Sequence, residues 1–242
     1  HAFYQWFVRT GDRKYHDAAK ALARHYRDMD VEHPYGEIHA HCLNHTISGP
    51  TPSHSWIQGM CDDYVLTGNP RTLEVLRQCG RWLCGIDPDS KTGRDMTRLF
   101  DNITDLYLFT GDPLFRDKAL EYARVIAKRQ KPEQLLSGGE AKSWFHHRYT
   151  AGTAFVWYGT YALTKLHRAM PTDELRKIFL TEMDITLKCT ERMPFVFRKY
   201  PEYRSRYSGK FGPAFDAREI GQWARGRGAV VWPSLAYAYE LT

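Results

Sequence analysis

Residues 64–69 read YVLTGN, and the same order of residue types is found at residues 7–12 (FVRTGD) and 107–112 (YLFTGD). In each copy an aromatic residue precedes a threonine by three positions, and glycine and then Asn or Asp follow. Glycine ends a helix in the left-handed conformation, and Asn or Asp caps the helix that comes next. Each copy therefore predicts a tight helical hairpin. The pairs Tyr161/Thr164 and Tyr239/Thr242 repeat only the first half of the pattern.

The segments that follow these three turns have apolar residues at helical spacing on one side, which predicts helices with one wet face. The segments that precede turns are more uniformly apolar, as at residues 154–158 and 229–232, so we expect them to be covered on more than one side. Inner and outer helices should alternate. The predicted apolar stripes are Tyr15, Ala18, Leu22, Tyr26 and Met29; Leu73, Leu76, Gly80 and Leu83; and Phe115, Ala119, Tyr122 and Ile126.

The connections back from outer to inner helices are long, at about residues 30–53, 86–94, 131–146 and 191–227. All of them lead to the N-terminal end of an inner helix, so they should form one face that favours anionic ligands. The pattern predicts an all-α protein, an α/α toroid of helical hairpins in which five inner and four outer helices form an incomplete (α/α)6 ring. A right-handed helical solenoid is the alternative. We expect residues 1–242 to be a single toroid domain of a larger, multidomain enzyme.

Composition places the chain among globular proteins, with 43% hydrophobic and 26% charged residues. The longest nearly apolar run, residues 151–163, is too short to span a bilayer, so we expect no membrane partner. The chain begins at His1, which predicts processing or an excerpt of a longer protein. We expect a secreted or periplasmic protein if the full-length protein has a signal peptide, and a cytoplasmic one otherwise. Five cysteines without a CxxC pair indicate buried thiols rather than a disulfide scaffold or zinc ribbon.

The formal charge is +6, and Arg and Lys are interleaved with aromatic residues between Arg192 and Arg227. Such a patch suits an anionic partner. No recognition-helix module, RNA-binding strand or zinc finger accompanies it, so nucleic acid is not the expected partner. An acidic polysaccharide or oligosaccharide fits better, because tryptophan and tyrosine provide flat faces on which sugars stack.

Residues 54–59 (HSWIQG), followed by YVLTGN, resemble the hairpin pattern of many toroidal glycosidases and polysaccharide lyases. With the preceding loop HAHCLNHT at residues 39–46, the combination resembles the C-terminal toroid of the exo-rhamnogalacturonan lyase-like family, most closely over residues 30–85. The resemblance implies a multidomain enzyme whose β-sandwich domains precede the toroid, and which cleaves uronate-containing pectic chains by β-elimination. No catalytic motif of the family is carried over, so the site residues rest on their chemistry.

Histidines are concentrated in the first long loop. Five of the eleven lie within 22 residues, at positions 33, 39, 41, 45 and 54. His41 and His45 are candidate catalytic bases, and His39 and His54 are candidate substrate contacts, although bonding to backbone or solvent would explain them equally well. A metal site from His39, His41 and His45 is the least favoured interpretation, because no carboxylate pattern nearby completes it. We therefore assign neither a metal nor a cofactor.

A second cluster, WFHHRY at residues 144–149, opens a buried inner helix. Tyr149 could transfer a proton, Arg148 could bind a uronate carboxylate, and His147 is a further substrate contact. Trp56 is a candidate stacking surface, and Arg218 belongs to a basic loop long enough to act as a substrate lid. Simple packing of the aromatic residues and a solvated loop are the structural alternatives.

β-Elimination requires a group that neutralises the uronate carboxylate, a base for the C5 proton and an acid for the leaving oxygen, which Arg, His and Tyr can supply. Hydrolysis needs two opposed carboxyl groups instead, and few acids lie at the expected mouth. A glycoside hydrolase is therefore the first alternative, and a non-catalytic carbohydrate-binding or scaffold domain is the second. The available acids are Glu37, Asp95, Glu140, Asp216 and Glu219.

Overall fold

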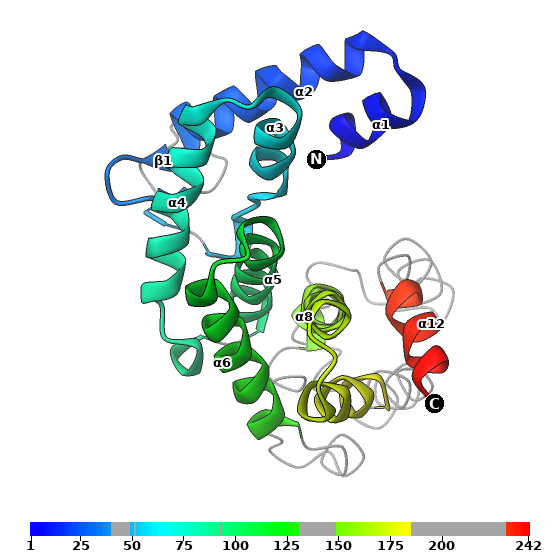
Figure 1. The fold of residues 1–242 in the computed structure, drawn as a ribbon. Helices are drawn as coiled ribbons and strands as arrows, with labels where there is room; N and C mark the ends of the chain where they lie inside the picture. Colours follow the sequence, from blue (N-terminus) through cyan, green and yellow to red (C-terminus); the bar gives the residue numbers. More distant parts are fainter. Residues whose placement is uncertain (40–48, 51, 92, 131–148, 185–230) are drawn as a thin grey trace, which may run out of the picture. The chain divides into compact units, whose positions relative to one another are not determined.

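A computed structural model describes residues 1–39, 49–50, 52–91, 93–130, 149–184 and 231–242, and these are mostly helical (Figure 1). The all-α class is confirmed, with neighbouring helices packed antiparallel. The described chain divides into two compact units. The first comprises His1–Lys91 and Arg98–Leu120, and the second comprises Thr92–Thr97 and Glu121–Thr242.

The first unit begins with two helical hairpins that lie side by side. One is formed by α1 (Ala2–Thr10) and α2 (Arg13–His25), and the other by α3 (Gln58–Thr67) and α4 (Pro70–Gly85). A π-helical turn, Tyr26–Asp30, extends α2, and the 3₁₀ helix Pro52–His54 precedes α3. A second 3₁₀ helix, Pro88–Ser90, follows α4. A third hairpin consists of α5 (Gly93–Thr110) and α6 (Pro113–Arg129).

The three predicted hairpin turns are confirmed. Gly11, Gly68 and Gly111 all have a positive φ, between 66° and 69°. The residue after each glycine accepts an N–H of the next helix with its side chain, as Asp112 does from Leu114 at 2.9 Å. The threonine before each glycine also forms hydrogen bonds within the turn.

Thr110 illustrates the hydrogen bonds of this threonine. Its hydroxyl donates to the Leu106 carbonyl at 2.7 Å and accepts the Asp112 N–H at 3.1 Å. Thr10 and Thr67 make the same pair of hydrogen bonds in their turns. The hydroxyl therefore serves a carbonyl at the helix C-terminus and an N–H of the turn, two groups that the helix itself leaves without partners.

The predicted stripes of α4 and α6 are largely confirmed, and that of α2 is wrong. Leu76, Gly80 and Leu83 are buried in α4, as are all four predicted positions of α6. In α2 and the π-turn the buried residues are Ala19, Ala23, Arg27 and Asp30, while Leu22 and Met29 are 56% and 53% exposed. Small alanines face the neighbouring helices, and the π-turn changes the 3.6-residue register beyond residue 25.

The expected contrast between inner and outer helices holds only in part. Residues 96–104 of α5 are all buried, as expected of an inner helix. In α1 only Tyr4 is buried, and in α3 only Met60 and Asp63. The uniformly apolar segments 154–158 and 229–232 fall where side chains are not described.

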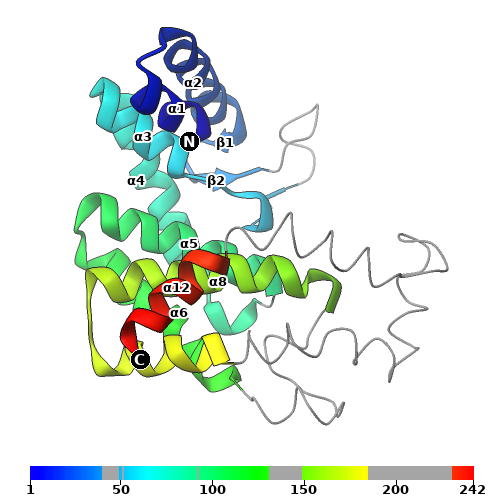
Figure 2. The same cartoon turned by 90° about the vertical axis from the view of Figure 1, so that its right-hand side faces the viewer.

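The loop predicted at residues 30–53 contains a short antiparallel hairpin of β1 (Val31–Glu32) and β2 (Glu37–Ile38), which lies beside α4 (Figure 2). His33 ties this hairpin to its surroundings, because its ring nitrogens bond to the Gln78 side chain at 2.9 Å and to the Arg27 carbonyl at 3.1 Å. Gly36 closes the hairpin with a φ of 75° against the α4 backbone.

The second unit contains α8 (Tyr149–Ala169), the helical residues 173–184 and α12 (Val231–Leu241). Its core includes Leu163, Phe179 and the buried end of α6. The His167 ring stacks on Phe179 and bonds to the Tyr237 hydroxyl at 2.8 Å. Among the described residues, no helix combines the length and apolar character needed to cross a membrane.

Candidate functional site

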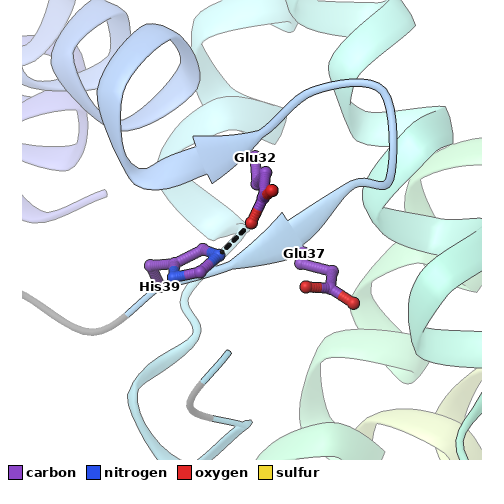
Figure 3. A group of neighbouring side chains, drawn as sticks. All are labelled: Glu32, Glu37 and His39. Atoms are coloured by element: carbon purple, nitrogen blue, oxygen red, sulfur yellow. Dashed lines mark hydrogen bonds and ion pairs between the residues drawn. The ribbon is translucent and has the colours of Figure 1, made fainter. Parts of the chain in front are cut away.

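The β1–β2 hairpin brings three ligand-type side chains to one face, which we call the hairpin cluster: Glu32, Glu37 and His39 (Figure 3). Glu32 and Glu37 are directly opposite each other in the strand register. His39 is two positions beyond Glu37 on the same extended segment, so the alternation of side chains places it on the same face. One ligand atom from each residue lies within 4.8 Å of the other two.

His39, a predicted substrate contact, is 3% exposed. Its Nε2 lies 2.9 Å from a carboxylate oxygen of Glu32, whose side chain is 42% exposed. Its Nδ1 is buried and has no hydrogen-bond partner in the described part of the chain. The imidazole is therefore held inside the protein with its Nε2 directed at the hairpin cluster, rather than pointing into solvent.

The segment before α3, the first residue of α3 and one side of α5 form a second group, which we call the Trp56 cluster: His54, Trp56, Gln58, Arg98 and Asp105. The guanidinium of Arg98 lies 5.1 Å from the centre of the Trp56 ring, within cation–π range. The His54 ring meets Trp56 edge-on at 5.9 Å. Two predicted site residues, His54 and Trp56, are thus brought together, and both are half-buried.

Hydrogen bonds to the backbone fix this segment on α5. Arg98 Nε donates to the Ser55 carbonyl at 2.6 Å, and Asn102 donates to the Ser55 hydroxyl at 2.8 Å. The Trp56 N–H donates to the Tyr26 hydroxyl at 2.9 Å. Burial raises the pKa of Tyr26 above its ordinary value. The backbone on either side of the indole is therefore held by groups from two distant parts of the sequence, Tyr26 and α5.

Arg98 is 2% exposed, so its ion pair is inside the protein rather than on the surface. Its guanidinium bonds to Asp101 at 2.7 Å and to the Gln58 carbonyl oxygen at 3.0 Å. The Gln58 amide in turn donates to Asp101 at 3.2 Å and to Asp105. The network commits the charge of Arg98 to internal partners and leaves it unsuited to bind a uronate carboxylate.

Asp101 and Asp105 were missed in the sequence analysis, which considered Asp95 as the acid of this helix. The missed signal is the spacing of Arg98, Asp101 and Asp105 along α5, which repeats at three and four residues and places them on one helix face. Asp101 is buried with Arg98, whereas Asp105 is half-buried. Of the other predicted acids, Glu37 lies in the hairpin cluster.

The remaining predicted site residues stay untested. Tyr149 begins α8, but its side chain is not described. The other predicted residues lie outside the described residues: His41, His45, His147, Arg148 and Arg218. The acids Glu140, Asp216 and Glu219 lie outside them as well.

Fold and site together define a mostly helical protein of antiparallel hairpins, with an aromatic and polar cluster at the start of α3 and an acidic and imidazole cluster on a β-hairpin. No protein-family model matches the chain, and neither a curated protein nor a solved structure does.

Proposed function

We propose that this chain is the helical domain of an enzyme that cleaves uronate-containing, pectic polysaccharides by β-elimination. The observation that carries the proposal is the Trp56 cluster, in which a half-buried indole contacts His54 and Arg98, and Arg98 is linked through Gln58 to Asp105. Aromatic faces with adjacent polar groups are suited to sugar rings, which offer C–H groups on a face and hydroxyls at the edge.

The packing of the Trp56 cluster supports a binding role because it fixes the indole in position before a sugar binds. The Ser55 carbonyl and the Trp56 N–H are bonded to buried groups, so the indole needs little ordering when a sugar binds. Gln58 and Asp105 are half-buried and are linked to Arg98 through the Gln58 amide group, and such polar side chains can bond to sugar hydroxyls.

The proposal includes a particular arrangement of the helical hairpins, an α/α toroid in which they form an incomplete ring within a larger enzyme. The repeated hairpin turns and the long connections at the other helix ends support it. The resemblance of residues 30–85 to exo-rhamnogalacturonan lyase-like toroids adds the expectation of preceding β-sandwich domains. Together they favour a long-loop face as the place where the polysaccharide binds.

In the proposed reaction, Arg148 binds the uronate carboxylate and makes the C5 proton more acidic. His45, His41 or Tyr149 removes that proton, the C4–O bond breaks, and an acid of the same set protonates the leaving oxygen. The product carries a C4–C5 double bond. The acid and base together contribute about 10²- to 10⁴-fold to the rate.

Hydrolysis is the second candidate, because two carboxylates of α5 are close together. Asp101 and Asp105 both accept a hydrogen bond from the same amide group of Gln58. Glycosidases use carboxyl pairs separated by about 5 to 9.5 Å. Burial of Asp101 against Arg98 counts against its taking part directly, which is why elimination comes first.

The deciding experiment incubates the protein with rhamnogalacturonan and polygalacturonate oligosaccharides. Elimination gives a product with the ultraviolet absorbance of an unsaturated uronate, whereas hydrolysis gives new reducing ends without it. Asp105→Asn should abolish hydrolysis, whereas under elimination it should weaken substrate binding without abolishing turnover. Binding without either product would indicate the non-catalytic carbohydrate-binding domain.

Trp56→Ala tests the Trp56 cluster itself. We expect it to weaken oligosaccharide binding about tenfold or more, which corresponds to about 1.4 kcal/mol. Trp6→Ala is the matched control, since Trp6 is a 50% exposed tryptophan on α1. Equal affinities of both variants and the unmodified protein would reject the Trp56 cluster as the sugar-binding surface.

A further inference from the structure

We propose that the hairpin cluster binds a divalent transition-metal ion of the Zn²⁺ class through Glu32, Glu37 and His39. This inference does not depend on the proposed function, because it rests on a different group of residues. It begins with the strand register, which fixes two carboxylates and one imidazole on the same face of the β1–β2 hairpin (Figure 3).

The opposed glutamates need a positive charge between them. Like charges directly opposite each other on two strands destabilise the pair, and Glu32 and Glu37 occupy such positions. Within the described ranges, neither carboxylate pairs with a lysine or arginine, and the one ion-pairing partner of Glu32 is His39. A bound divalent cation would turn this repulsion into attraction for both carboxylates.

The buried imidazole points to the same conclusion. His39 is 97% buried, and its Nε2 is aimed into the hairpin cluster at Glu32. Its Nδ1 has no partner in the part of the chain that the structure describes. A metal bond to Nε2 would supply a stronger interaction in place of the hydrogen bond to Glu32, and the neutral ring would then carry its proton on Nδ1.

The donor set selects the class of ion. Ca²⁺ and Mg²⁺ prefer oxygen ligands, whereas imidazole with carboxylates suits Zn²⁺ and its first-row neighbours. Ligand atoms at about 2.1 Å from a tetrahedral ion are about 3.4 Å apart, so His39 Nε2 and the Glu32 oxygen, now 2.9 Å apart, need to separate only slightly. The half-buried Glu37 completes the site by a change of side-chain rotamer.

Three protein ligands leave at least one coordination position for water or for an oxygen of a substrate, as in catalytic zinc sites. The proposed site is open to solvent at Glu32, whose side chain is 42% exposed. An ion could therefore enter from solvent past Glu32 while His39 anchors it from inside.

The test is a titration of the metal-free protein with Zn²⁺ by calorimetry and with Co²⁺ by visible absorption. We expect one equivalent to bind, and we expect Glu32→Gln, Glu37→Gln and His39→Gln each to raise the dissociation constant at least tenfold. Glu74→Gln is the matched control, because Glu74 is an exposed acid on α4 that pairs with Arg71. It should bind like the unmodified protein, and Ca²⁺ should not compete.

The two glutamate variants keep the test decisive if His39→Gln fails to fold, because Glu37 is half-buried and the Glu32 side chain is 42% exposed. Circular dichroism without metal confirms that each variant is folded. Absence of binding to the unmodified protein would overturn the proposal. So would unchanged binding in folded Glu32→Gln or Glu37→Gln, because the ion would then be held elsewhere.

Discussion

Replacing Gly36 with alanine tests how the β1–β2 hairpin is packed on α4. Gly36 has a φ of 75°, and a Cβ added there would collide with the backbone carbonyl group of Gln78 and come within 2.7 Å of the Cys79 nitrogen. A helix backbone cannot move aside as the end of a flexible side chain can. Either the hairpin must shift or α4 must bend.

The expected cost has two parts. A left-handed backbone costs a residue with a Cβ about 1–2 kcal/mol, and forcing an additional carbon into a packed contact costs about 1–3 kcal/mol. Gly68→Ala separates the parts, because Gly68 has a φ of 66° but open space where its Cβ would be. Gly68→Ala should therefore lose only the free energy that the left-handed backbone costs.

The free energy of unfolding of both variants is measured by urea denaturation, followed by circular dichroism. We expect Gly36→Ala to be less stable than Gly68→Ala by about 1–3 kcal/mol, at a similar dependence on urea. Equal losses in the two variants would refute the close contact between the hairpin and α4, and would remove the support on which the placement of Glu37 and His39 depends.

Three further predictions concern single interactions. Thr110→Val removes a hydroxyl that bonds at both ends of the α5–α6 turn, so urea denaturation should show a loss of about 1–2 kcal/mol, and no loss would contradict its part in the turn. Arg98→Met removes the buried ion pair with the Asp101 carboxylate and should cost about 3–5 kcal/mol, whereas Arg71→Met on the exposed surface should cost less than about 1 kcal/mol by the same measurement. Burial, with the Arg176 charge adding to it, lowers the pKa of His167 below its ordinary 6.5, so the unfolded chain binds a proton that the folded protein does not. Stability should therefore fall as the pH is lowered through the window below 6.5, and melting curves of His167→Gln should show a weaker pH dependence.

The hairpin turns were predictable because all of their interactions are local. In the turn at residues 107–112, the threonine, glycine and capping aspartate act on groups within four residues of themselves. No distant part of the chain has to be known. The same holds for the one-sided burial of α6, where apolar spacing alone indicated the buried face.

The buried face of α2 could not be predicted in the same way. Apolar spacing favoured Leu22 and Met29, but packing against neighbouring helices buries the small side chains of Ala19 and Ala23. Small residues contribute little to an apolar pattern, yet they let helices approach closely. The π-turn that changes the register after residue 25 has no clear signal in the sequence.

The candidate site shows the same division. The sequence by itself determined the turns, the helical class and the concentration of histidines between residues 33 and 54, because these follow from composition and from interactions along the chain. Only the tertiary structure decided that His39 meets Glu32 and Glu37, and that Arg98 is buried beneath Trp56. Strand register and the packing of α3 on α5 bring together residues up to 47 positions apart. Periodicity within one segment carries no information about such partners, because it reports only which side of that segment avoids water.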